Sequence, residues 1–201
     1  MSADKRLELD ATPDWLSGEM PPGYQTRLLE IQRLSADLRE MEQSGRLLWR
    51  VGDDLAESIG DAFVALGFEA ERTPDSGSVI VKLSDRRRLL LHVSGSTDPI
   101  QKKSPELTHV FQLLNETAEA ADRVVLATNT SPDIPPADRA AAVGPEALDL
   151  LQRLGVNVLT GPALFGLWRL ALEEKDRARK FVDWLHEQDG GMFQVPATLT
   201  R

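Results

Sequence analysis

Apolar residues recur at helical spacing over residues 23–50. They lie three or four positions apart, and charged residues such as Arg33 and Glu40 fall between them. This period near 3.5 residues predicts a long amphipathic helix with one apolar seam. The seam residues expected to contact a partner are Leu28, Ile31, Leu34, Leu38 and Met41. The seam packs either on the core of the same chain or on a helix of another chain, and the pattern leaves both open.

The pattern over residues 51–188 predicts an α/β domain. Helical periodicity comes first, and three β-branched or leucine-rich segments that follow it predict a meander of three strands. Helices and strands then alternate, which is typical of parallel strands joined by crossover helices. We therefore expect a three-layer domain with a mixed sheet of five strands. The expected strands are 68–72, 78–84, 87–94, 123–129 and 156–160, and the expected helices are 53–66, 106–121, 145–154 and 162–174, the last of which can extend to 188.

Composition narrows the class of protein. Acidic residues number 32 against 23 basic ones, and the resulting net charge of −9 disfavours general binding of nucleic acid. The chain has no cysteine, which excludes a thiolate nucleophile and cysteine-ligated metal centres. No apolar run is long enough to span a membrane or resembles a signal peptide, so we expect a cytoplasmic protein. Residues 1–22 and 189–201 are rich in turn-forming residues and are expected to be tails.

The order of the expected elements resembles that of a known superfamily. A helix, a meander of three strands, a helix and a further strand form the core of the restriction-endonuclease-like, or PD-(D/E)xK, nucleases. Four segments are also similar in amino-acid sequence to members of this superfamily, including bacterial ones. These are LLWRVGDDLAESIGDAFVALGFEAER at 47–72, LLLHVSGST at 89–97, VVLATN at 124–129 with the Pro-Pro-x-x-Arg of 135–139, and LGVNVLTGPALFGL at 154–167. The resemblance implies a restriction-endonuclease-like core.

The resemblance also implies where a nuclease site would lie. Active members carry an acid on the second strand, and Glu or Asp, one residue and Lys on the third. The carboxylates hold Mg²⁺ and the lysine orients the attacking water. The corresponding positions in this chain are Ser78, His92 and Ser94. Serine offers neither a carboxylate nor an ammonium group, and histidine is a poor Mg²⁺ ligand. We therefore expect a pseudo-nuclease with no metal and no cofactor.

Other polar residues are expected near this degenerate cleft. Glu57 on the first helix of the domain is a candidate metal neighbour, although a solvated carboxylate is the simpler interpretation. The resemblance places helix 106–121 beside the cleft. His109 would then meet His92, and Gln112 would lie one turn further along the same helix.

Basic residues gather at one strand turn and in the loop after the third strand. They are candidate phosphate contacts, with a solvated hairpin tip as the simpler interpretation. The residues are Arg86, Arg87, Arg88, Lys102 and Lys103.

These observations favour a catalytically inactive nuclease-like domain that binds a protein partner or acts as a scaffold. Its N-terminal helix would form a homodimer or dock on another protein. The alternative is a nucleic-acid-binding protein that does not cleave, in spite of the net negative charge. A third interpretation is an active nuclease whose metal site has moved to Asp75 or Asp85.

Overall fold

The structure is a computed structural model that describes residues 20–73, 77–84, 86–117 and 121–195. The chain divides into two compact units, Met1–Met41 and Glu42–Arg201. Across the described part of the chain, every helix is too short or too polar to pass through a lipid bilayer.

Most of helix α2 (Tyr24–Gly45) belongs to the first unit, and it confirms the predicted long helix. None of its 22 residues is buried. Five large apolar side chains on it are about half exposed or more: Leu29 65%, Ile31 48%, Leu34 60%, Leu38 57% and Met41 53%. The helix gives way to a 3₁₀ turn, η1 (Arg46–Leu48), before the predicted end at residue 50. Leu47 of this turn is buried in the core of the second unit.

The second unit contains a mixed sheet of six strands, one more than predicted. The strands lie side by side in chain order, with β2 antiparallel to both neighbours and β3 to β6 parallel to one another. Their bounds are β1 (Glu69–Thr73), β2 (Ser78–Ser84), β3 (Arg87–Val93), β4 (Asp122–Thr128), β5 (Asn157–Thr160) and β6 (Gly191–Met192).

The sixth strand lies within residues 189–201, which the sequence predicted to be a tail. β6 pairs with β5, and the backbone N–H of Phe193 donates to the carbonyl of Val158 at 2.9 Å. The Phe193 side chain is 1% exposed. Two residues, one of them glycine, carry no period that a sequence pattern can detect. This part of the predicted tail is therefore an ordered edge of the sheet.

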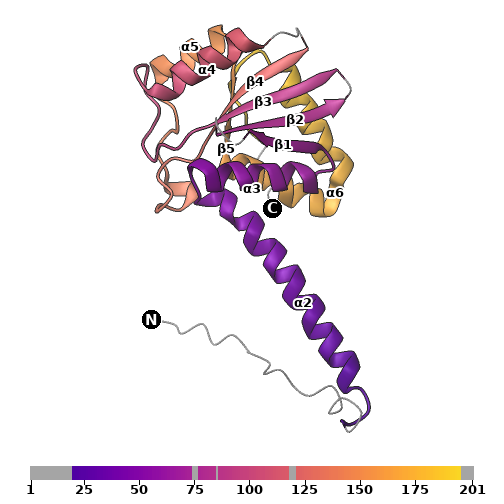
Figure 1. The fold of residues 1–201 in the computed structure, drawn as a ribbon. Helices are drawn as coiled ribbons and strands as arrows, with labels where there is room; N and C mark the ends of the chain where they lie inside the picture. The colour runs from indigo at the N-terminus through magenta and orange to yellow at the C-terminus, as the bar shows by residue number, and fades with distance from the viewer. Residues whose placement is uncertain (1–19, 74–76, 85, 118–120, 196–201) are drawn as a thin grey trace. The chain divides into compact units, whose positions relative to one another are not determined.

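Helices cover both faces of the sheet (Figure 1). On one face lie α3 (Gly52–Ala65) and α6 (Gly161–Glu187), and on the other lie α4 (Pro105–Glu116) and α5 (Pro145–Arg153). A short 3₁₀ turn, η2 (Pro136–Asp138), lies between β4 and α5. Helix α6 extends to Glu187, within the longer of the two predicted bounds, and it is kinked at Glu174, where the backbone is not helical.

Successive residues of each strand point to opposite faces and so enter two separate cores. Leu89 and Leu91 of β3 belong to the apolar cluster beneath α3 and α6. Val124 and Leu126 of β4 belong to the cluster beneath α4 and α5. On this second face α4 packs on β3 and β4, and α5 packs on β5 and β6. The part of the face next to α4, over β2 and β3, is where the candidate site lies.

Candidate functional site

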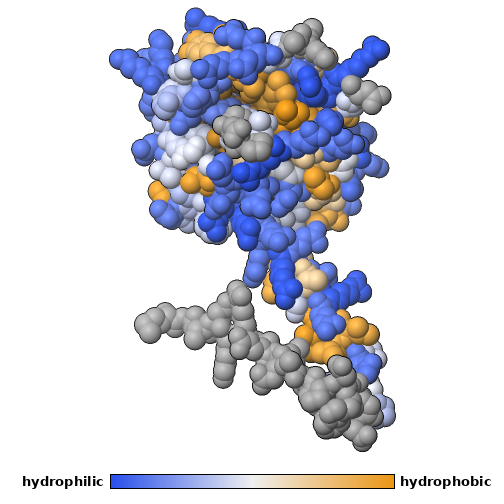
Figure 2. All heavy atoms as spheres, in the orientation of Figure 1, coloured by the Kyte–Doolittle hydropathy of each residue, from blue (hydrophilic) through white to orange (hydrophobic). Residues whose placement is uncertain are grey.

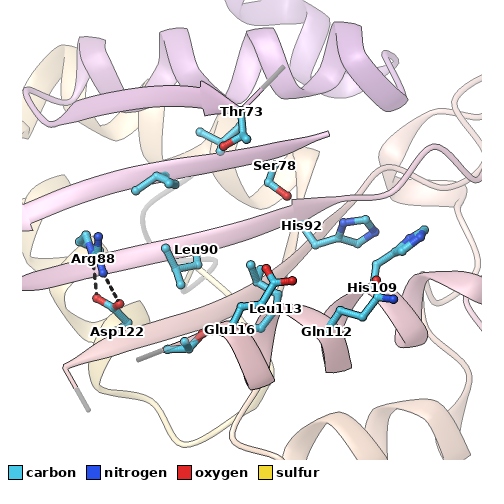
Figure 3. Close-up of a pocket in the computed structure, with 13 residues that line it drawn as sticks. Thr73, Ser78, Arg88, Leu90, His92, His109, Gln112, Leu113, Glu116 and Asp122 are labelled. Carbon is cyan, nitrogen blue, oxygen red and sulfur yellow. Dashed lines mark hydrogen bonds and ion pairs between the residues drawn. The ribbon is translucent and has the colours of Figure 1, made fainter. Parts of the chain in front are cut away.

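A cavity of about 680 Å³ lies between α4 and the strands β2 and β3 (Figure 3). One part of its lining is polar, with Ser78, His92, His109 and Gln112. The middle is apolar, with Ile80, Leu90 and Leu113, and an ion pair between Arg88 and Asp122 lies beyond it. The lining therefore changes from hydrogen-bonding groups through apolar ones to charged ones.

Adjacent strands place Ser78 and His92 side by side. The two residues are directly paired across β2 and β3, and both are buried. Cross-strand partners point to the same face of a sheet, so both reach the cavity. From α4, the His109 ring approaches His92 with 5.0 Å between centroids and 56° between planes, and Gln112 lines the same space (Figure 3). The structure thus brings together four of the residues singled out in the sequence.

The electrostatics of His92 set its chemistry. Burial is the main cause, with a smaller contribution from the neighbouring His109, of a pKa lowered from the usual 6.5 to about 4, and Glu106 partly opposes this shift. The imidazole is therefore neutral at neutral pH. A neutral imidazole can accept a hydrogen bond or bind a metal ion, but it gives a phosphate no positive charge.

Ser94, the third position that the resemblance singled out, is not among the residues that line the cavity. It follows the end of β3, where its backbone N–H donates to the carbonyl of Ala127 at 2.8 Å. Its hydroxyl donates to Oε1 of Glu106 at 3.2 Å, and both residues are buried. Sequence reasoning missed Glu106. The signal that could have found it is the Glu106-Leu-Thr-His109 spacing, because residues three apart share one face of a helix.

The ion pair between Arg88 and Asp122 was also missed. Arg88 donates from Nη2 and Nε to the two carboxylate oxygens of Asp122, at 2.6 and 3.0 Å. The Asp122 side chain is 1% exposed, whereas that of Arg88 is 38% exposed. The parallel register of β3 and β4 places the two residues opposite each other. Only the long-range pairing of these strands reveals this partnership.

The structure does not gather the candidate phosphate contacts into one strip. Arg86 is exposed, and Arg87 and Arg88 point to opposite faces of the sheet. Arg87 pairs with Asp183 of α6 at 3.2 Å. Strand β3 is about 20 Å long at about 3.3 Å per residue. Arg87 and Arg88 lie at its start, whereas Lys102 and Lys103 lie in the loop after its other end. Lys102 lies 3.8 Å from the carboxylate of Glu146.

Glu57, the candidate metal neighbour, does not line the cavity. It is exposed on α3, which packs on the other face of the sheet. Among the described residues, no three or more His, Cys, Asp or Glu side chains converge in a way that could hold a metal ion. Asp75 and Asp85, the residues of the relocated-site interpretation, lie outside the described residues.

The cavity combines two neighbouring imidazoles whose planes are tilted, an amide, an apolar middle and an ion pair whose two charges balance. This lining suits a neutral ligand, or a ligand that binds to the imidazole groups of the protein, rather than a polyanion. Comparisons of the chain with protein-family models, with curated proteins and with solved structures found no match.

Proposed function

We propose that this chain is a nuclease-like domain that does not cleave nucleic acid. It acts instead as a protein-binding or scaffold module that associates with a second copy through α2. The observation that carries this proposal is the exposure of the apolar side chains along α2, a helix with no buried residue. Figure 2 shows apolar side chains gathered on this helix.

The spacing of these side chains suits a helix–helix contact. Ile31, Leu34, Leu38 and Met41 follow one another at intervals of three, four and three residues, as knobs do in a two-helix seam. Fully burying one such side chain is worth about 1.5–3 kcal/mol. A row of exposed large apolar residues on one element marks an interaction site more often than it marks a solvated surface. A second copy of α2 supplies a matching row.

The absence of cleavage is proposed from the residues at the motif positions. The order α3, β1, β2, β3, α4, β4 is the order on which the resemblance to restriction-endonuclease-like proteins rests. At the positions that would hold Mg²⁺ and orient water, the chain has Ser78, His92 and Ser94. A phosphodiester-cleaving site needs carboxylates to bind its metal and a cation to stabilise the developing charge. Neither is present at these positions.

Binding of nucleic acid without cleavage is the second candidate, and the ion pairs weigh against it. Arg87, Arg88 and Lys102 each have an acidic partner, so a phosphate would have to displace a carboxylate. The net charge of −9 adds a repulsive field. Titration with a labelled DNA duplex at low salt separates the candidates. Salt-dependent binding that Arg86→Ala and Lys103→Ala weaken would favour the second candidate.

Light scattering on the full chain tests self-association. We expect a mass of twice the 22.2 kDa chain, and the single-chain mass for the double variant Ile31→Lys/Leu38→Lys. The matched control is Gln25→Lys/Gln32→Lys, which adds two lysines to the same helix outside the seam. The control should stay dimeric, and circular dichroism should show that both variants are folded. A single-chain mass for the unmodified protein at all concentrations would contradict self-association.

A further inference from the structure

Two histidines from different elements face one another in the cavity. His92 extends from β3 and His109 from α4, with 5.0 Å between ring centroids (Figure 3). Two imidazoles bound to one tetrahedral ion, each nitrogen about 2.0–2.1 Å from the ion, place their ring centroids about 5 Å apart. The separation of the two rings is therefore compatible with a shared ion.

A buried carboxylate lies close to this pair. Glu106 is on the same face of α4 as His109, one turn earlier, and it interacts electrostatically with His92. Glu106 is 8% exposed, and its carboxylate accepts a hydrogen bond from the hydroxyl of Ser94 at 3.2 Å. The salt bridges between described residues do not include Glu106. A cation bound beside this carboxylate would gain a favourable electrostatic interaction.

We propose that His92 and His109 bind a divalent transition-metal ion such as Zn²⁺, and that Glu106 supplies the negative charge that favours the ion. Imidazole nitrogen prefers Zn²⁺, Ni²⁺, Co²⁺ and Cu²⁺, whereas Mg²⁺ prefers oxygen ligands. The site is thus different in ligands and in metal from the carboxylate site of an active nuclease. Glu106 acts from the outer shell of the site, and the hydrogen bond from the Ser94 hydroxyl fixes the orientation of its carboxylate.

Such an ion would be held by two protein ligands, with water or a donor atom of a bound molecule completing its coordination. The described residues offer no set of three or more metal-binding side chains around it. Open coordination positions facing the 680 Å³ cavity are characteristic of metal sites that bind a ligand, since structural zinc sites are closed by four protein ligands. The metal would also connect α4 to β3, so binding stabilises the folded chain.

Isothermal titration of the untagged full chain with Zn²⁺ tests the proposal, with the visible absorption of bound Co²⁺ as a second readout. We expect one ion per chain at pH 7.5 and no binding of Mg²⁺ at the same concentration. His109→Ala should weaken Zn²⁺ binding at least 10-fold and abolish the Co²⁺ spectrum. His109 is exposed, so this variant is expected to fold. Glu106→Gln should weaken binding about 10-fold, as losses of outer-shell partners do.

The matched control is His186→Gln, which removes the histidine outside the cavity. Nε2 of His186 lies 2.7 Å from the carbonyl of Ala121, and glutamine can donate the same hydrogen bond. This control should bind Zn²⁺ with the affinity of the unmodified chain. Equal affinity of His109→Ala and the unmodified chain would overturn the proposal, as would equal binding of Mg²⁺. The inference does not rest on the proposed function, so Ile31→Lys/Leu38→Lys should bind Zn²⁺ normally whether or not the chain dimerises.

Discussion

The two faces of the sheet are made from alternate residues of the same strands, and yet they differ in chemistry. On β3, Leu89 and Leu91 point towards α3 and α6 and are fully buried among apolar side chains. Arg88, Leu90 and His92 point the other way, into the cavity beside α4. The first face is closed by helices along its length. The second is closed only in part, and its polar groups find partners on other elements.

This difference separates what stabilises the fold from what is available for binding. Residues on the closed face exchange water for apolar contacts, so their contribution follows the area that they bury. Residues on the open face are held by specific pairs, such as Arg88 with Asp122 and His92 with His109. Substitutions of neighbouring residues on one strand can therefore compare the two faces directly.

The largest difference is expected between Leu91→Ala and Leu90→Ala. Leu91 is fully buried in the closed core, and its truncation should lower the free energy of unfolding by about 3–5 kcal/mol. Leu90 borders the cavity, so its truncation only enlarges an existing space and should cost about 1–2 kcal/mol. Urea unfolding measures both values. Equal losses would show that the two faces are packed alike.

Arg88→Ala is expected to have the next largest effect. It leaves the carboxylate of Asp122, 1% exposed, without its cation, and should cost about 2–4 kcal/mol. Arg87→Ala is the matched control, because it removes a partly exposed ion pair with Asp183 and should cost less than about 1 kcal/mol. Urea unfolding of both variants at pH 7 gives the comparison. If Arg87→Ala lowered the free energy of unfolding as much as Arg88→Ala, the burial of Asp122 would not explain the cost of removing its partner.

The smallest of the three effects is a dependence on pH. His92 has a pKa of about 4 in the folded chain and about 6.5 when unfolded. Above pH 6.5 both states are neutral, and as pH falls towards 4 only the unfolded state takes up the proton. The free energy of unfolding should therefore fall by about 2 kcal/mol between pH 7 and pH 4.5. The other titratable groups are the same in the unmodified chain and in His92→Gln. The difference between their free energies of unfolding therefore isolates the loss due to His92. An unchanged difference across this range would show that His92 titrates normally.

The fold was predictable where the sequence has a clear period. The long helix α2, the strand β2 and the kinked helix α6 follow apolar spacings of 3.5 or two residues, or a proline at a helix start. Strand β6 was not predictable, because two residues carry no period and its partner β5 lies more than thirty residues earlier in the chain.

The candidate site was predictable only in part, for a related reason. Ser78, His92 and His109 were found because a resemblance supplied their relative places. Asp122 and Glu106 were missed because their roles depend on which residues the strand register and the helix packing bring opposite them. The sequence indicates an apolar seam on α2, but it does not identify what covers that seam.

Incubation of the full chain with defined DNA and RNA, in Mg²⁺ and separately in Mn²⁺, tests the central claim most directly. We predict no cleavage above the level of the His92→Ala variant, since Ser78, His92 and Ser94 stand where the proposed resemblance would place the metal ligands and the lysine. Metal-dependent cleavage by the unmodified chain that is lost in His92→Ala, while Leu90→Ala retains it, would contradict the account.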